Sequence, residues 1–216
     1  MKNWQKWLMA IPFIAAFSMG MPALAAGELW WFTGDWANTL FVLLIAGMWL
    51  AAASFVQPER RRRRRGLTRV LISVGFVLLI PVAVYERTHG PAAVRSAAWS
   101  ALGLALCTMA IPLGFATVRT LGRFYVPDPD VLPGQELATD GVYRTVRHPM
   151  YSAALLWVLG FPLVIRSLWG VIVSLLLVAP ALWLRIREEE AMLLREFGDE
   201  YREYQARTWR VIPFVF

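Results

Sequence analysis

The sequence predicts an all-α protein: a polytopic transmembrane helical bundle of five or six spans with a C-terminal helical hairpin and a cytosolic tail. Hydrophobic residues make up 58% of the 216 residues. Only 17% are charged, against roughly a quarter in a typical soluble domain. The apolar residues also fall in long blocks rather than in the short periodic patterns of a soluble core. Lipid is therefore expected to be the main solvent.

The formal net charge of +7 has a topological explanation. Lys2 and Lys6 are the only lysines, and six arginines stand together from Arg60 to Arg65. Such a run beside an apolar span stays in the cytoplasm and attracts anionic headgroups. It has no interleaved aromatic residues or fold signature behind it that would indicate nucleic acid. We expect membrane lipids as partners and no nucleic acid.

Residues 1–26 are expected to form a signal peptide or a first transmembrane helix. Lys2 and Lys6 precede an apolar stretch from Trp7 to Met19, and the Ala-x-Ala at 23–25 matches a signal-peptidase site. Both alternatives start in the cytoplasm and leave Gly27 outside, and the sequence does not decide between them.

Residues 27–118 are expected to hold the transmembrane helices of the N-terminal part. The block from Trp36 to Val56 would extend about 31 Å as a helix, which matches the hydrocarbon thickness. Leu67 to Tyr85 returns outward, Glu86 to Arg95 turns, and Ala97 to Val118 comes back in. This order obeys the positive-inside rule. Together with the signal-like N-terminus it predicts a multi-pass protein of a bacterial inner membrane, with its C-terminus in the cytosol.

Residues 119–216 are expected to form the cytosol-facing part: a loop, a helical hairpin and the tail. Arg119 to His148 is polar and rich in turn formers. Tyr151 to Leu184 is apolar, too long for one span, and broken near Arg166-Ser167. A tight hairpin with both ends facing the cytosol fits this pattern.

The return helix is predicted to continue beyond the membrane, because Trp183 to Phe197 keeps helix formers while its charge rises. Residues spaced 3, 4 and 4 apart share one face, and they are Ile186, Glu189, Leu193 and Phe197. The carboxylate of Glu189 in this apolar row needs a cationic partner, either a protein Arg or a ligand amine. Gly198 is a plausible helix stop, and Tyr201 and Tyr204 lie one turn apart after it.

Two polar clusters are expected to meet at the cytosolic end of the hairpin. Arg147-His148-Pro149 starts the outgoing helix, where Pro is tolerated, and Glu188-Glu189-Glu190 ends the return helix at the same level. Structural alternatives exist, since Arg147 can snorkel to headgroups and His148 can cap a helix. The glutamates can likewise form a solvated face paired with Arg185, Arg187 and Arg195.

These motifs resemble a known superfamily. Asp140-Gly-Val-Tyr-Arg-Thr-Val-Arg-His-Pro-Met-Tyr151 is followed by Glu188-Glu189 and by Phe197-Gly-Asp-Glu-Tyr-x-x-Tyr204. In this order they are similar to the isoprenylcysteine carboxyl methyltransferase and phospholipid methyltransferase superfamily of integral membrane enzymes. The resemblance covers roughly Leu137 to Pro213. Ala153 replaces a usual Gly, and Trp209 replaces a usual Pro, which leaves the methyl acceptor uncertain more than the cofactor.

The resemblance implies an enzyme that uses S-adenosylmethionine. Acidic residues suit the ammonium of this cofactor, a basic residue its carboxylate, and aromatic rings its adenine. The residues expected to bind it are Tyr143, Arg147, His148, Tyr151, Glu188, Glu189, Tyr201 and Tyr204. His148 is expected to be catalytic as an optional base, and Arg210 to orient an anionic acceptor. A lipidic, isoprenoid or small thiol or carboxyl acceptor is favoured over a prenylated protein, which is doubtful in bacteria.

Two other functional classes stay open. An NADPH-dependent membrane reductase of the steroid and sterol reductase type has a similar C-terminal layout, but a 2′-phosphate needs several Arg or Lys where this cluster is led by glutamates. A non-enzymatic scaffold or transporter is the other class, although the span from Trp36 to Val56 holds no ionisable residue and the span from Leu67 to Ile80 holds only Arg69, near its start. No metal is expected, because Cys107 is the only cysteine and no His-Glu-x-x-His occurs.

Overall fold

The computed structural model describes residues 40, 67–89, 96–125, 131 and 133–214. Its α-helices are α5 (Leu67–His89), α6 (Ala97–Leu121), α7 (Pro149–Val164), α8 (Leu168–Val173) and α9 (Ala179–Arg207). Short 3-10 helices are η3 (Gly122–Phe124) and η4 (Gly141–Arg144), and η5 (Ser174–Val178) is π-helical. The regular secondary structure of the described residues is helical, apart from one isolated parallel bridge between Val146 and Trp209. The spans expected at 7–19 and 36–56 lie outside the described residues, so the count of five or six stays a prediction.

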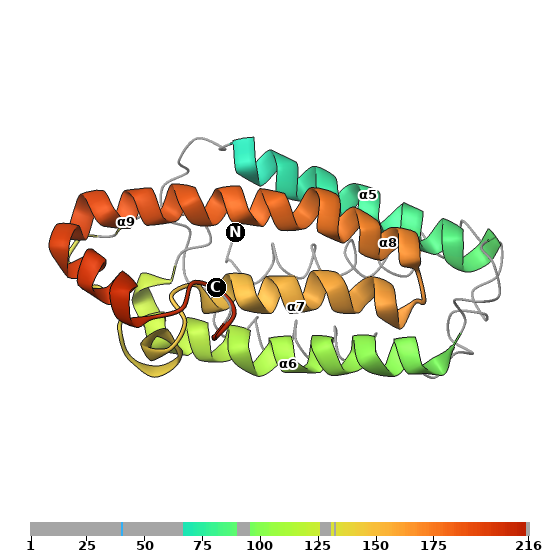
Figure 1. The fold of residues 1–216 in the computed structure, drawn as a ribbon, viewed down its shortest axis with the longest axis horizontal. Coiled ribbons are helices and arrows are strands. Elements are labelled where there is room, and N and C mark those ends of the chain that lie inside the picture. The colour runs from blue at the N-terminus through green and yellow to red at the C-terminus, as the bar shows by residue number, and fades with distance from the viewer. Residues whose placement is uncertain (1–39, 41–66, 90–95, 126–130, 132, 215–216) are drawn as a thin grey trace, which may run out of the picture.

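The hairpin has the form that the sequence predicts. α7 leads away from the polar end, the chain reverses at Ile165 to Ser167, and α8, η5 and α9 return as one rod (Figure 1). α7 lies between α6 and α9, and α5 runs along α8 and α9 on the other side. Within the described residues, three helical stretches are long and apolar enough to cross a membrane: Val70–Arg87, Ala97–Leu121 and Leu168–Arg207.

The reversal between α7 and α8 is fixed by a buried carboxylate from α5. Arg166 takes a positive φ of 60° at the turn, and Ser167 caps α8 by accepting from Gly170 N at 2.8 Å. Glu86 accepts from Ser167 Oγ at 2.6 Å and from Trp169 N at 2.7 Å. α5 therefore continues to His89, four residues past its expected end at Tyr85, and this extension brings Glu86 onto the N-terminus of α8.

α6 and α7 pack closely through small residues. A Cβ added to Gly160 would lie 2.6 Å from Cys107 Sγ and 2.8 Å from Gly103 O. Cys107 is completely buried at this contact. The small residues let the two backbones approach as in other membrane helix pairs, and the position of α7 is thereby tied to α6.

α9 bends at Gly198 and continues, where the sequence predicts a stop. Gly198 has a φ of 55°, which glycine adopts at little cost, and the helix then runs on to Arg207. Tyr201 and Tyr204 are therefore part of α9 rather than of a separate segment. The tail returns from Thr208 toward the start of α7 (Figure 1).

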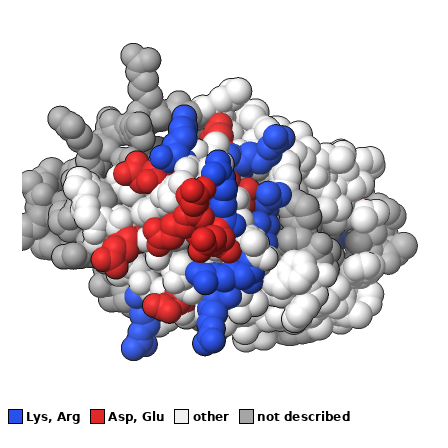
Figure 2. All heavy atoms as spheres, turned by 60° about the vertical axis from the view of Figure 1, so that its left-hand side comes forward, with Lys and Arg blue, Asp and Glu red and all other residues white. Residues whose placement is uncertain are grey.

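Charged side chains concentrate at one end of the bundle, which we call the charged end: the start of α7, the last turns of α9 and the tail. Figure 2 shows this end coming forward, with acidic and basic side chains crowded together and much of the remaining described surface uncharged. A surface pair here is Arg202 with Asp199. A charged end next to an uncharged flank is expected of a helix bundle whose charged end lies at the membrane boundary.

Candidate functional site at the charged end

The tail pairs with the loop that precedes α7. Arg147 N donates to Trp209 O at 2.8 Å, and His148 N donates to Arg210 O at 3.0 Å. Trp209 N donates to Thr145 O at 2.9 Å. Three backbone hydrogen bonds therefore hold residues far apart in sequence side by side, and they place Arg210 next to His148.

His148 occupies the N-cap position of α7, with Pro149 as the first helical residue. Its backbone carbonyl accepts from Tyr151 N and Ser152 N, each at 3.0 Å. The side chain is 3% exposed and makes no capping bond of its own. The imidazole therefore does not cap α7. It is buried against α9, where it contacts the carboxylates of Glu189 and Glu190.

Glu190 is the centre of the site, although the sequence pointed to its neighbours. Its Oε1 lies 3.3 Å from Arg147 Nε and 3.3 Å from His148 Nε2. Arg210 contacts both carboxylate oxygens, with Nε 3.0 Å from Oε1 and Nη2 2.9 Å from Oε2. Arg147, placed by expectation against the cofactor carboxylate, is here bonded to a protein carboxylate. Three groups from the loop, α7 and the tail thus converge on one residue of α9, and together they offset the cost of burying it.

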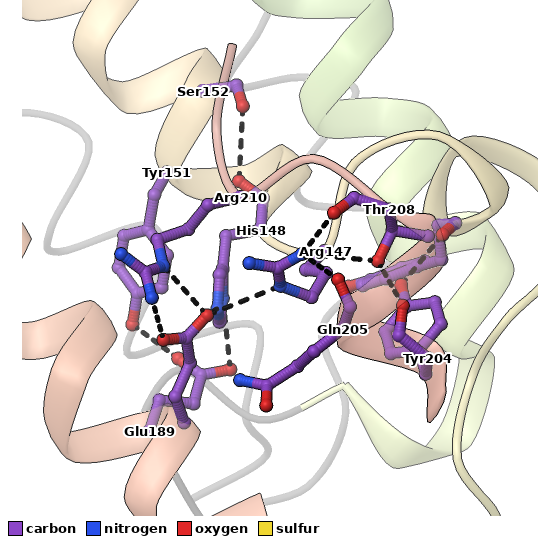
Figure 3. Close-up of polar contacts among 11 residues, drawn as sticks. Arg147, His148, Tyr151, Ser152, Glu189, Tyr204, Gln205, Thr208 and Arg210 are labelled. Carbon is purple, nitrogen blue, oxygen red and sulfur yellow. Dashed lines mark hydrogen bonds and ion pairs between the residues drawn. The ribbon is translucent and has the colours of Figure 1, made fainter. Parts of the chain in front are cut away.

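Arg147 also closes the end of α9. Its Nη1 donates to Gln205 O at 3.0 Å and to Thr208 O, and it lies 3.4 Å from Thr208 Oγ1 (Figure 3). The last carbonyls of a helix have no partner within the helix, and a guanidinium can serve several of them at once. One side chain therefore joins the end of α9 to Glu190.

Glu189 has a different environment from that of Glu190. Its Oε2 accepts from the Tyr151 hydroxyl at 2.7 Å, and its Oε1 lies 4.0 Å from His148 Nδ1 (Figure 3). The side chain is 26% exposed, and the structure places no Arg or Lys of the described residues in an ion pair with it. The cationic partner that the sequence demands is therefore not a protein Arg among those residues.

Glu188 lies away from this cluster. Its Oε2 accepts from Thr68 Oγ1 of α5 at 2.7 Å and lies 3.9 Å from Arg185 Nη1. Half of its side chain is exposed. Of the three adjacent glutamates, Glu188 therefore joins α5 to α9, Glu190 joins α9 to the tail, and Glu189 faces His148 and Tyr151.

Of the remaining tyrosines, Tyr143 and Tyr204 are bonded to each other, and Tyr201 is not hydrogen-bonded through its hydroxyl to any described residue. The Tyr204 hydroxyl donates to Tyr143 O at 2.7 Å, which holds η4 against α9. Burial raises the pKa of the Tyr143 hydroxyl, so this group stays neutral. The Tyr201 hydroxyl is fully buried and has no hydrogen-bond partner among the described residues. A buried polar group left in this way is costly and is a candidate to meet a ligand.

Two site residues received no role from the sequence, although Glu190 belongs to the predicted glutamate cluster. Glu190 is spaced four residues after Ile186, and both are buried, so the interval Leu182-Ile186-Glu190 was the signal available. Trp183 lies under Arg210, whose guanidinium carbon is 4.9 Å from the ring centroid, and no sequence pattern indicated this long-range contact. Among the described residues no group of three or more His, Cys, Asp or Glu is placed to hold a metal ion.

Comparison with known proteins identifies what this chain is similar to. The phospholipid methyltransferase family model matches residues 98–200. Protein-S-isoprenylcysteine O-methyltransferase of Schizosaccharomyces pombe is 41% identical over 83 residues, which are 37% of this chain and 34% of that protein. A probable protein-S-isoprenylcysteine O-methyltransferase of Oryza sativa subsp. indica is 29% identical over 160 residues, 71% of this chain and 84% of that protein. The chain thus matches about a third of the first relative and most of the second.

Solved structures show the same fold. A eukaryotic intramembrane Ras methyltransferase, described as an isoprenylcysteine carboxyl methyltransferase, superposes with a TM-score of 0.65 at 21% identity. The match covers 94% of this chain and 74% of that one. The helical arrangement described above is therefore one that an intramembrane methyltransferase also adopts.

Proposed function

We infer the function from the premise that this chain belongs to the superfamily of isoprenylcysteine carboxyl methyltransferases and phospholipid methyltransferases. The proposed reaction is methyl transfer from S-adenosylmethionine to a lipophilic acceptor at the cytosolic membrane face. The proposed site is the cluster of His148, Tyr151, Glu189 and Tyr201 at the charged end.

The observation that carries the proposal is the contrast between Glu189 and Glu190. Both are near His148, but Glu190 is already held by Arg147 and Arg210, whereas Glu189 contacts a neutral phenol. A partly open carboxylate with no ion pair to an Arg or Lys of the described residues, and only His148 at 4.0 Å, favours a cationic ligand. An ammonium or sulfonium cofactor meets that requirement.

The hydrogen-bonding groups and the charges of the site also favour S-adenosylmethionine. Tyr201 keeps a buried hydroxyl for which the described residues offer no partner, and S-adenosylmethionine carries several hydrogen-bonding groups. NADPH fits less well, since its 2′-phosphate would need basic groups, while Arg147 and Arg210 are engaged by Glu190. The charge balance of the site therefore supports the methyltransferase over the reductase.

The chemistry that the cofactor supplies is a methyl group on a positively charged sulfur, ready for in-line displacement. The chain then has to bind, orient and exclude water rather than to activate the donor. Glu189 binds the cation, and the Tyr151 hydroxyl fixes the carboxylate in place. His148 faces both glutamates, and it would take a proton only from an acceptor amine or thiol, since a carboxylate acceptor has none to lose.

The acceptor is proposed to be lipophilic, because the site lies at the end of an apolar hairpin. The relatives named above are protein-S-isoprenylcysteine O-methyltransferases, which makes the carboxylate of an isoprenylated cysteine one candidate. Lipid, isoprenoid and small thiol acceptors remain in the proposal. Arg210 is paired with Glu190, which neutralises most of its charge. Its attraction for an anionic acceptor is therefore weaker than that of an unpaired arginine.

Calorimetric titration of the purified protein in detergent tests the cofactor directly. We expect the wild type to bind S-adenosylmethionine, and Glu189→Gln to bind at least about tenfold more weakly, as for loss of a hydrogen bond to a charged group worth about 1.5–3 kcal/mol. Glu188→Gln is the matched control, because that carboxylate is bonded to Thr68 instead. Folded wild type that gives no heat at millimolar S-adenosylmethionine, or that binds NADPH in its place, would refute the proposal.

A further inference from the structure

The short tail after α9 presents apolar side chains that nothing in the described structure covers. Trp209 is 40% exposed, Ile212 51% and Phe214 84%, whereas Val211 between them is buried. The rings of Trp209 and Phe214 lie 5.8 Å apart, so these two exposed side chains form one patch. The tail therefore has an inner side toward the protein and an outer apolar side.

The depth of this patch follows from the length of α7. α7 has 16 residues and spans about 24 Å, which is less than the roughly 30 Å of the bilayer hydrocarbon. With the reversal at Ile165 to Ser167 placed at the far boundary of the hydrocarbon, the start of α7 falls at or within the near boundary. Whatever packs beside the first turn of α7 lies at membrane level.

The tail packs beside that first turn. Ser152 Oγ donates to Val211 O at 2.6 Å, and His148 N donates to Arg210 O at 3.0 Å. The residues flanking Val211 are therefore held at the depth of the first turn of α7, and their outward side chains meet whatever surrounds the bundle there. Trp and other apolar residues at this depth are typical of the membrane interface.

We propose that the tail from Trp209 to Phe214 is an interfacial anchor that inserts its apolar outer side into the bilayer beside α7. Membrane contact would thereby hold Arg210, which sits within the same segment, on Glu190. The partner is the lipid bilayer itself, and the inference does not depend on the reaction that the site catalyses. A second copy of the chain over the same patch is the competing occupant.

Site-directed spin labelling can decide between these occupants. Nitroxide would be attached at Phe214→Cys, and separately at Ile212→Cys, in a Cys107→Ala background, with the protein in vesicles of phosphatidylethanolamine and phosphatidylglycerol. Power saturation then compares collisions with oxygen, which partitions into lipid, and with a water-soluble nickel chelate. Leu176→Cys, 68% exposed on η5, is the hydrocarbon reference. Arg202→Cys, 66% exposed near the end of α9, is the aqueous reference.

For an anchored tail, the ratio of oxygen to nickel accessibility at Phe214→Cys is several-fold higher than at Arg202→Cys and approaches that at Leu176→Cys. Ile212→Cys should behave in the same way, which protects the test if one variant folds poorly. A ratio equal to that at Arg202→Cys would place the tail in water and overturn the proposal. Low accessibility to both reagents, with spin-spin broadening, would show a second copy over the patch and would overturn it as well. Neither outcome would bear on cofactor binding at Glu189.

Discussion

Arg210 and Glu190 form a two-pronged ion pair, with Nη2 2.9 Å from Oε2 and Nε 3.0 Å from Oε1. The pair connects the tail that follows α9 to Glu190, near the middle of the same helix. Glu190 also contacts His148 and Arg147. The loop, α7 and the tail are therefore all bonded to this one side chain of α9. The site is therefore assembled around a residue that, in the proposed function, need not touch the substrates.

Replacing Glu190 should destabilise the fold strongly. Glu190→Gln leaves Arg147 and Arg210 facing a neutral amide, and breaking a buried pair by removing one partner costs about 3–5 kcal/mol. We expect a loss of about 3 kcal/mol, since Arg210 is one quarter exposed and part of its charge is solvated. SDS-induced unfolding in mixed micelles measures it. Asp199→Asn, which removes an exposed pair with Arg202, should change stability by less than about 0.5 kcal/mol; equal losses in the two variants would contradict the central role of Glu190.

Arg147→Lys should not be a conservative change. The guanidinium reaches Glu190, Gln205 O and Thr208 O together, and a single ammonium cannot reproduce this fork. We expect a loss of about 1–3 kcal/mol, as for a buried acceptor left without its partner, and faster proteolysis after Arg207. Arg195→Lys is the control, because the Arg195 side chain makes an exposed bond to Ala191 O. If both variants unfold at the same SDS fraction as the wild type, Arg147 does not close α9 as described.

Gly160→Ala tests the α6 and α7 contact. The added methyl would meet Cys107 Sγ at 2.6 Å and Gly103 O at 2.8 Å, so the helices must separate, and overpacking of this kind costs about 1–3 kcal/mol. Gly114→Ala, on α6 with its nearest neighbour at 3.9 Å, is the matched control and should be tolerated. Comparison of the two variants by unfolding and by gel filtration in detergent gives the result. A Gly160→Ala protein as stable as Gly114→Ala would mean that α6 and α7 are less tightly packed.

Much of the fold could be predicted because its causes are local in sequence. Long apolar blocks, the break near Arg166-Ser167 and the conformational freedom of Gly198 each follow from short-range chemistry. The extension of α5 beyond Tyr85 did not follow, since it depends on Glu86 reaching the N-terminus of α8 in another part of the chain. The continuation of α9 to Arg207 was missed for a related reason, because Gly198 bends the helix without ending it.

The site was predicted as a neighbourhood rather than as a set of contacts. Three adjacent glutamates point in directions about 100° apart around a helix, and only the rotation of α9 against α7 assigns Glu190 to the interior, Glu189 to the His148 side and Glu188 to α5. The pairing of Val146 with Trp209 places Arg210 next to His148. It joins segments that are distant in sequence, so no sequence periodicity indicates it. The roles of the predicted cofactor residues stay predictions.

Tyr201→Phe separates stability from binding at a single atom. The Tyr201 hydroxyl is buried without a partner among the described residues, so its removal relieves a desolvation cost of about 1–3 kcal/mol. We expect the ligand-free variant to be at least as stable as the wild type in SDS unfolding. If the hydroxyl bonds S-adenosylmethionine, the variant should also bind that cofactor about five- to tenfold more weakly, as for a lost hydrogen bond of about 1–1.4 kcal/mol. Tyr204→Phe gives the contrasting control, because its hydroxyl is bonded to Tyr143 O and its loss should lower stability. Unchanged cofactor affinity in Tyr201→Phe would show that the ligand leaves this hydroxyl unsatisfied and would remove Tyr201 from the proposed site.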